Sequence, residues 1–129
     1  MSKPAKLPVL VIEDEPSVIA FIIAALERNG YAVVPVSSGA DALQMLARGQ
    51  YLGVISDIRT PGGVNGGDVH HWISHHRRDL LQRMIFITGD TASEETAKLL
   101  KKTGTPCLEK PFRVTDLISM VERVFEEAP

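Results

Sequence analysis

Short apolar runs alternate with longer amphipathic segments along the whole chain. The short runs are rich in Val, Ile and Leu, which is typical of strands that are buried on both faces, whereas the longer segments repeat apolar residues at helical spacing. The pattern predicts strands at residues 7–12, 31–36, 52–57, 83–88 and 105–109. It predicts helices at residues 16–28, 39–48, 68–78, 93–102 and 114–126. Five successive strand-then-helix units favour an α/β fold, with a parallel sheet covered by helices on both faces.

Residues that start or stop helices support these boundaries. Pro16 suits the first turn of a helix, because its missing N–H group would have no partner there. Ser37 or Ser38 can cap the second helix, and Gly104 can end the fourth. A glycine-rich loop at residues 60–67 separates the third strand from the third helix.

Composition places the chain among soluble globular proteins. Its 129 residues suit one domain, 1–129, that buries roughly two thirds of its unfolded surface, and we expect an ordered core from about 6 to 127. A net charge of −2 with no basic cluster argues against direct binding to nucleic acid. The chain has no apolar run long enough for membrane insertion, no signal-peptide core and one cysteine, Cys107, so we expect a cytoplasmic protein or a piece of a longer cytoplasmic chain.

Polar side chains follow four of the predicted strands. Glu13 and Asp14 come after the first strand and Asp57 ends the third, while Thr88 ends the fourth and Lys110 follows the fifth. Because parallel strands place their carboxyl ends at one edge of the sheet, we expect these side chains to meet there. Three carboxylates, a hydroxyl and an ammonium group suit one divalent cation and one phosphoryl group.

Each of these residues has both a chemical and a structural interpretation. Clustered carboxylates repel one another unless a cation joins them, and an all-oxygen ligand set favours Mg²⁺. Asp57 can attack phosphorus to form an aspartyl phosphate, or it can simply cap the following loop. Glu13 and Asp14 can equally be a solvated helix start, and Thr88 and Lys110 ordinary residues at strand ends. Their joint occurrence on successive strands favours the chemical interpretation.

Four motifs at the predicted strand ends carry a resemblance to a known family. They are Val-Ile-Glu-Asp-Glu-Pro at 11–16, Ser-Asp-Ile-Arg-Thr-Pro at 56–61, Ile-Thr-Gly-Asp at 87–90 and Glu-Lys-Pro-Phe at 109–112. As a set they span most of the chain, which resembles the receiver domain of two-component response regulators. The resemblance implies a flavodoxin-like, doubly wound sheet of five parallel strands in the order 2-1-3-4-5, with five helices.

The resemblance also implies a role for each residue of the site. Asp57 would accept a phosphoryl group from a histidine of a sensor histidine kinase or of a histidine phosphotransfer protein. The implied ligands of Mg²⁺ (or Mn²⁺) are Glu13, Asp14, Asp57 and the backbone carbonyl of Arg59. Lys110 would neutralise the phosphoryl oxygens, and Thr88 would hydrogen-bond the bound phosphoryl group and so switch the interaction surface.

A domain of this kind is a switch with slow autodephosphorylation, and we expect it to turn over no metabolite. The Lys110–Pro111 bond resembles a family position at which the peptide bond is usually cis. The loop at 60–67 is one residue longer than the commonest form and resembles receivers attached to hybrid sensor histidine kinases.

Three residues depart from the family pattern or vary within it. Arg59 and Asp90 occupy positions that tune the lifetime of the phosphoryl group in relatives, and their opposite charges suggest a pair across the entrance of the site. Cys107 stands at the switch position, where relatives usually carry Tyr or Phe. Because a small thiol cannot act as a rotating ring, we expect the signal to travel by backbone movement.

The first helix carries no charge from residue 16 to residue 26. Helical spacing predicts that it faces the sheet with Val18, Phe21, Ile22 and Ala25. The residues that this leaves exposed, and that we expect to dock a histidine-bearing helix of the partner, are Ile19, Ala20 and Ile23. A homodimer through the face of the last helix is a further expectation.

Two other functions compete with the phosphoacceptor. One is a pseudo-receiver, an interaction module that acts without phosphorylation. The other is an aspartyl-phosphate phosphatase of the haloacid dehalogenase type, which requires a second Asp two residues after the nucleophile. That position is Arg59, which weighs against the phosphatase.

Overall fold

One parallel sheet with the strand order β2-β1-β3-β4-β5 forms the centre of the computed structural model, which describes residues 7–126. Its strands are β1 (Val9–Ile12), β2 (Val33–Val36), β3 (Gly53–Asp57), β4 (Met84–Thr88) and β5 (Cys107–Glu109). The predicted flavodoxin-like order is confirmed. The expected limits of the ordered core, 6 and 127, lie outside the described residues.

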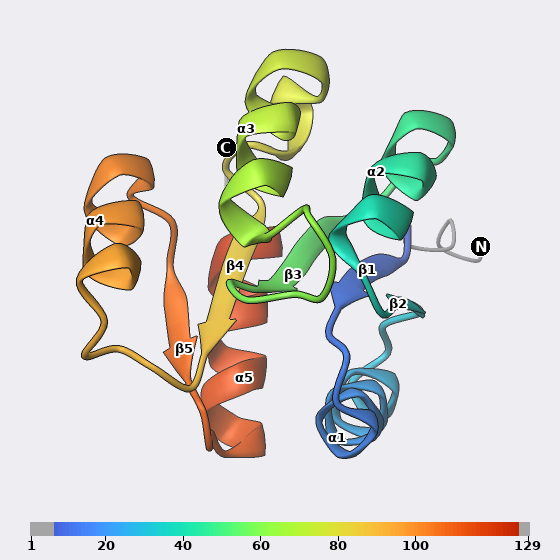
Figure 1. Ribbon diagram of the computed structural model, residues 1–129. Helices are drawn as coiled ribbons and strands as arrows, with labels where there is room; N and C mark the ends of the chain where they lie inside the picture. The colour runs from blue at the N-terminus through green and yellow to red at the C-terminus, as the bar shows by residue number, and fades with distance from the viewer. Residues whose placement is uncertain (1–6, 127–129) are drawn as a thin grey trace.

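Helices cover both faces of the sheet (Figure 1). On one face lie α1 (Pro16–Arg28) and α5 (Val114–Val121), and on the other lie α2 (Gly39–Arg48), α3 (Gly66–His76) and α4 (Glu94–Thr103). A short 3₁₀ turn, Arg78–Leu80, precedes β4, and a π-helical turn, Glu122–Glu126, continues α5. Within the described residues, no helix has the length and apolar character needed to cross a membrane.

Most element boundaries agree with the prediction to within two residues. Helix α3 begins two residues earlier than predicted because Asn65 caps it. The Asn65 side chain accepts a hydrogen bond from the amide of Asp68 (2.9 Å), and the Asp68 carboxylate accepts one from the amide of Asn65 (3.0 Å). Of the two predicted caps for α2, Ser38 is the one used: it accepts a hydrogen bond from the amide of Asp41 (3.1 Å).

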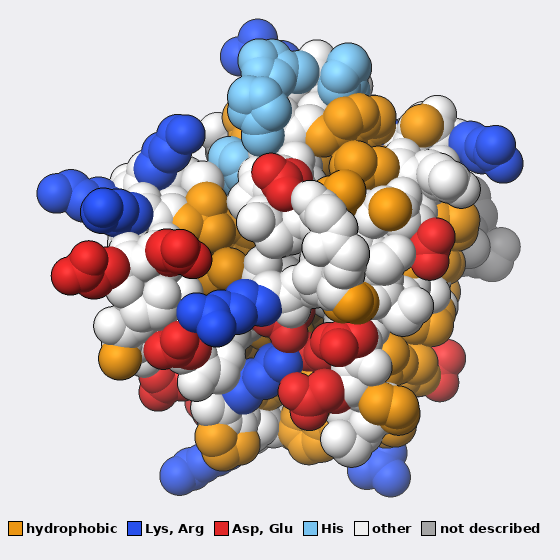
Figure 2. Space-filling view, viewed as in Figure 1, with side chains coloured by type: hydrophobic (Ala, Val, Ile, Leu, Met, Phe, Trp, Pro, Cys, Tyr) orange, Lys and Arg blue, Asp and Glu red, His pale blue; other side chains and the backbone are white. Residues whose placement is uncertain are grey.

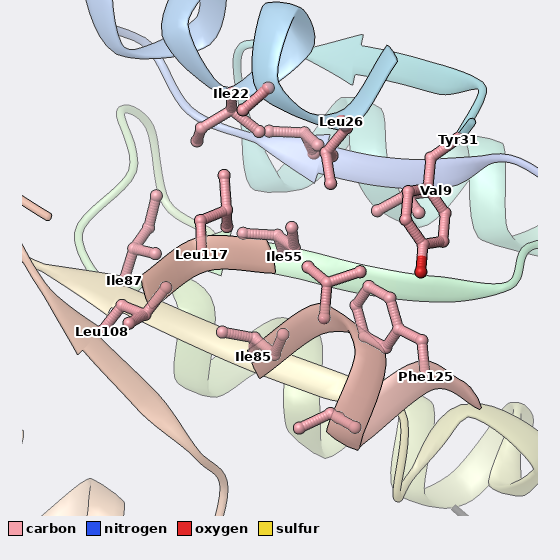
Figure 3. Packing of buried hydrophobic residues seen from close by; sticks show 14 residues of the cluster. Val9, Ile22, Leu26, Tyr31, Ile55, Ile85, Ile87, Leu108, Leu117 and Phe125 are labelled. Carbon is pink, nitrogen blue, oxygen red and sulfur yellow. The ribbon is translucent and has the colours of Figure 1, made fainter. Parts of the chain in front are cut away.

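Alternate residues of the strands belong to two separate hydrophobic clusters. Val9 and Ile55 point toward α1 and α5, as Figure 3 shows, whereas Leu10 and Val54 pack on the side of α2 and α3. Strands buried on both faces explain the continuous apolar runs of the sequence.

The strand register also fixes the functional edge. Ile12 pairs with Ser56, Asp57 pairs with Ile87, and Thr88 pairs with Glu109. The polar residues at the carboxyl ends of these strands therefore lie along one edge.

Residue 53, the first of β3, must be a glycine because a larger side chain would not fit there. A Cβ atom at this position would lie 2.4 Å from the ring of Phe125, which is buried over the strand. We expect Gly53→Ala to lower the free energy of unfolding by about 1–3 kcal/mol, the usual cost of overpacking a core. Urea denaturation measures this change.

Gly63→Ala is the matched control, because a Cβ atom at residue 63 would have no neighbour within 4 Å. Equal unfolding midpoints for the two variants would show that the contact between Gly53 and Phe125 does not restrict residue 53.

Candidate functional site

Acidic and basic side chains gather over the carboxyl ends of the strands (Figure 2). Carboxylate oxygens of Glu13, Asp14 and Asp57 lie within 4.8 Å of one another. Glu13 is fully buried and Asp57 is 7% exposed, while Asp14 is exposed. The structure thus brings together the three carboxylates that the sequence placed on two separate strands.

One oxygen of the buried Glu13 carboxylate is hydrogen-bonded, and the other forms an ion pair. Oε2 accepts hydrogen bonds from the backbone amides of Asp14 (2.9 Å) and Glu15 (3.0 Å). Oε1 lies 2.6 Å from Nζ of Lys110. Because a buried charge is costly without compensation, these contacts explain how Glu13 remains in the interior.

Lys110 joins the two buried carboxylates. Its Nζ donates to Oδ2 of Asp57 (2.8 Å) and lies 2.6 Å from Oε1 of Glu13. Burial alone would lower the pKa of Lys110, but its hydrogen bond to Asp57 and the negative charges of Asp57 and Glu13 outweigh burial, and the net direction is upward. The ammonium group is therefore charged at neutral pH. The peptide bond to Pro111 is cis, as the resemblance implied.

Glu15 directly follows the acidic pair and precedes helix α1. Its side chain is exposed, but one of its carboxylate oxygens lies 4.0 Å from Nζ of Lys110. Sequence reasoning therefore missed a third acidic neighbour of this lysine.

The donor set fits a hard divalent cation. It consists only of carboxylate oxygens, and one of the three residues, Asp14, is open to solvent. These are the features of sites that bind Mg²⁺ or Mn²⁺ with several waters retained. The amide of Arg59 donates to Oδ1 of Asp57 (3.2 Å), which orients the carboxylate. A role for the Arg59 carbonyl as a further ligand stays a prediction.

Thr88 ends β4 next to this cluster. It is 2% exposed, and its hydroxyl accepts a hydrogen bond from the amide of Asp90 (3.1 Å). Its carbonyl accepts one from the amide of Lys110 (2.8 Å), which ties the ends of β4 and β5 together. In the loop after Thr88, the Thr91 hydroxyl donates to the Glu109 carboxylate, a contact that the sequence did not predict.

Arg59 and Asp90 form the pair that their charges suggested. The guanidinium Nη2 lies 3.1 Å from Oδ2 of Asp90, and the pair joins the loops that follow β3 and β4. Both side chains are largely exposed (63% and 44%), so the pair contributes little to stability. Its effect on phosphoryl lifetime stays a prediction.

Cys107 is half-buried in β5 and packs against the cluster on the side of α2 and α3. Burial raises the pKa of its thiol to about 11, and the charges of Glu109 and Asp57 act in the same direction. The group is a neutral thiol at physiological pH, which argues against a reactive cysteine. Its role in switching stays a prediction.

Helix α1 is rotated relative to the predicted orientation. Its buried stripe is Ile22, Ala25 and Leu26, so Phe21 was wrongly assigned to the face that packs on the sheet: it is 39% exposed. Because the stripe is centred one residue further along, the flanking residues change as well.

This rotation changes the exposure of Ile19 and Ile23, which, like Ala20, were predicted to be exposed and to dock the partner. Ala20 is exposed, but Ile19 and Ile23 are half-buried. Ile19 lines a depression with Pro35 and Val36 of the edge strand β2.

The exposed face of Phe21 borders a groove beside the site. The Phe21 and Phe112 rings meet edge to face, with centroids 5.8 Å apart. The groove has a volume of about 460 Å³ and is also lined by Val18, Lys110 and Pro111. An apolar surface therefore adjoins the ammonium group of the site.

Comparison with known proteins identifies relatives over most of the chain. The model of the response regulator receiver domain family matches residues 9–122. The response regulator receiver protein CpdR of Brucella abortus is 28% identical over 116 residues, which cover 90% of this chain and 94% of that protein. The transcriptional regulatory protein TcrA of Mycobacterium tuberculosis is 26% identical over 121 residues, but the chain spans only 47% of its length.

Solved structures share the architecture. The signal receiver domain of a putative Luxo repressor protein from Vibrio parahaemolyticus has a TM-score of 0.81 at 27% identity, with 95% of this chain and 92% of that chain covered. The receiver domain of the sensor histidine kinase PA1611 from Pseudomonas aeruginosa has a TM-score of 0.82 at 24% identity, with 94% and 98% covered. The latter structure holds a magnesium ion in its active-site cleft.

Proposed function

Because the chain belongs to the response regulator receiver domain family, we propose that it is the phosphoacceptor domain of a two-component phosphorelay, with Asp57 as the acceptor. The observation that carries the proposal is the contact of Lys110 with the nearly buried carboxylate of Asp57 (2.8 Å), inside a cluster of three carboxylates. The donor is a phosphohistidine of a sensor histidine kinase or of a histidine phosphotransfer protein. We place the domain in the cytoplasm, where such donors act.

Phosphoryl transfer here requires positioning and charge neutralisation rather than acid–base chemistry. A carboxylate oxygen of Asp57 forms a bond to phosphorus as the bond between phosphorus and the histidine nitrogen breaks. The amide of Arg59 fixes one oxygen of Asp57, and the Lys110 ammonium group lies at the other, where it offsets the charge of the incoming group. When bound by Glu13, Asp14 and Asp57, Mg²⁺ supplies further positive charge at the phosphoryl oxygens.

Switching follows from the position of Thr88. Its hydroxyl accepts a hydrogen bond from the amide of Asp90 and can donate its own proton to a phosphoryl group on Asp57, which would draw the loop toward the site. The same loop is tied to Arg59 through Asp90 and to Glu109 through Thr91. Movement of this loop therefore changes contacts on two neighbouring elements, with no aromatic ring at residue 107.

The competing functions gain no support from the geometry. A pseudo-receiver does not need the lysine–carboxylate contact that is present at Asp57. A phosphatase of the haloacid dehalogenase type needs an acid at residue 59, where the Arg59 guanidinium pairs with Asp90. We propose a signalling switch that dephosphorylates slowly and turns over no metabolite.

Incubation with Mg²⁺ and phosphoramidate, followed by intact-mass measurement, tests the proposal. We expect the gain of one phosphoryl group per chain, and no gain after chelation of the metal, because Glu13, Asp14 and Asp57 would then repel the incoming phosphoryl group. Phosphorylation that continues at the same rate in excess chelator would contradict the metal site. Absence of any gain, both with this donor and with a phosphohistidine protein, would favour the pseudo-receiver.

Arg59→Ala is expected to raise the rate of dephosphorylation about threefold to tenfold, because opening one side of the entrance removes on the order of 1 kcal/mol of barrier to the attacking water. The decay of the phosphorylated protein, followed by intact mass, measures this rate. Asp90→Ala breaks the same 3.1 Å pair from the other side and should have a similar effect. An unchanged decay in both variants would remove the pair from the mechanism.

We propose that a histidine-bearing helix docks in the groove of Phe21 and Phe112, which brings its histidine next to Lys110. Phe21→Glu should then abolish transfer from a phosphohistidine protein and leave phosphorylation by phosphoramidate intact. Ala20→Glu, at the neighbouring exposed residue of α1, should weaken the same transfer. Normal transfer to both variants would exclude this part of α1 as the docking surface.

Dimerisation through α5 stays a prediction.

A further inference from the structure

The loop after Asp57 rests on the first residue of helix α2. A Cβ atom at Gly39 would lie 2.4 Å from the carbonyl oxygen of Val64 and 2.8 Å from its Cγ1. Real Cβ atoms do not approach other atoms so closely, so the contact requires glycine at residue 39. The Val64 side chain packs at the edge of the cluster between the sheet and α2 and α3.

The other end of the loop approaches the site just as closely. A Cβ atom at Gly66 would lie 2.7 Å from the carbonyl oxygen of Asp57 and 2.9 Å from Cα of Ile58. The amide of Gly66 donates to the carbonyl of Ile58 (2.8 Å). The first turn of α3 therefore lies directly against the backbone of the acceptor residue.

A hydrogen bond within the loop connects these two contacts. The hydroxyl of Thr60 donates to the carbonyl of Val64 (2.5 Å), the same carbonyl that lies over Gly39. Arg59, whose amide orients the Asp57 carboxylate, directly precedes Thr60. A shift of the Val64 carbonyl would therefore move Thr60, and with it the neighbouring Arg59 amide that orients the Asp57 carboxylate.

We propose that Gly39 and Val64 are positioning residues for the Asp57 site: the N-terminus of α2 seats the loop and holds the Asp57 carboxylate in the orientation that binds the cation. The inference rests on the proposed function and adds helix α2 to the strand ends that determine the geometry of the site. An added Cβ atom must displace the Val64 carbonyl, and disturbing the groups that orient metal ligands usually lowers the affinity for the metal about 10-fold to 100-fold.

Calorimetric titration of the folded protein with Mg²⁺ tests the proposal. We expect Gly39→Ala to raise the dissociation constant about tenfold and to speed hydrogen exchange of the Gly66 amide in the metal-free protein. Val64→Ala, which introduces no overlap, should change both quantities in the same direction by a smaller factor. A purely structural role would lower the unfolding midpoint and leave the dissociation constant of the folded protein unchanged.

Gly63→Ala is the matched control, because it makes the same glycine-to-alanine change in the loop that contacts Gly39, at a position with no neighbour within 4 Å. It should bind Mg²⁺ like the wild type. Wild-type dissociation constants for both Gly39→Ala and Val64→Ala would overturn the inference and leave the proposed function standing. Failure of the wild-type protein itself to bind Mg²⁺ would contradict the proposed metal site, and the inference with it.

Discussion

Lys110→Ala is expected to lower the free energy of unfolding by about 3 kcal/mol, because removal of one partner leaves the other charge of a buried pair uncompensated. Glu13 is fully buried, and Oε1 of Glu13 lies 2.6 Å from the Lys110 ammonium group. Asp57 would lose the same partner. The variant should also be phosphorylated about 100-fold to 1,000-fold more slowly, the usual loss when one group that stabilises transition-state charge is removed. Urea unfolding and the rate of phosphoryl incorporation measure the two effects.

The stability effect has a defined pH dependence. Because the pKa of Lys110 is raised above its ordinary value of 10.5, its stabilisation is fully present below that pH. The stabilisation is lost as the pH rises through the raised value. The difference in unfolding free energy between wild type and Lys110→Ala should therefore be constant near neutral pH and shrink in strongly alkaline solution.

Lys98→Ala supplies the control, since Lys98 is an exposed residue of α4. We expect it to change stability by less than about 0.5 kcal/mol. If Lys110→Ala unfolded at the same urea concentration as Lys98→Ala, the contacts of Lys110 would have no energetic importance.

Asp57→Asn should abolish phosphorylation entirely while leaving the fold intact. The amide side chain has nearly the same shape, and its oxygen can still accept the hydrogen bond from the amide of Arg59. It lacks the negative charge of a nucleophile and removes one of three carboxylates from the metal cluster, so Mg²⁺ binding should weaken as well. Intact-mass measurement after incubation with phosphoramidate gives the first result, and calorimetry gives the second.

Asp41→Asn is the corresponding control, because Asp41 is an exposed carboxylate of α2. It should be phosphorylated like the wild type. Gain of a phosphoryl group by Asp57→Asn at the wild-type rate would place the acceptor at another residue.

The edge that carries the site was predictable because two simple patterns coincide. Continuous apolar runs predict parallel strands buried on both faces, and polar residues such as Asp57 and Thr88 stand where these runs end. Parallel pairing then brings them to one edge without further information. The sequence predicted that Lys110 would lie near the carboxylates of the site. It did not predict that Lys110 would contact Glu13 and Asp57 at the same time.

Features that depend on loop paths and small rotations could not be predicted. A helix as apolar as α1 allows several orientations, and packing against the sheet selected the stripe that exposes Phe21. The hydrogen bond from Thr91 to Glu109 joins a loop to a strand end, and no local sequence pattern predicts it. The contact of Val64 with Gly39 requires the path of an eight-residue loop, which composition does not determine.

Chemical mapping of the acceptor tests the central claim most directly. The protein is phosphorylated with phosphoramidate and Mg²⁺ and reduced with borohydride, which converts an aspartyl phosphate to homoserine, and its peptides are then sequenced by mass spectrometry. We predict homoserine at residue 57 alone, because among residues 7–126 only Asp57 combines the lysine contact, the oriented carboxylate and the position at the end of β3. Homoserine at Asp14 or at another aspartate, with Asp57 unchanged, would contradict the assignment.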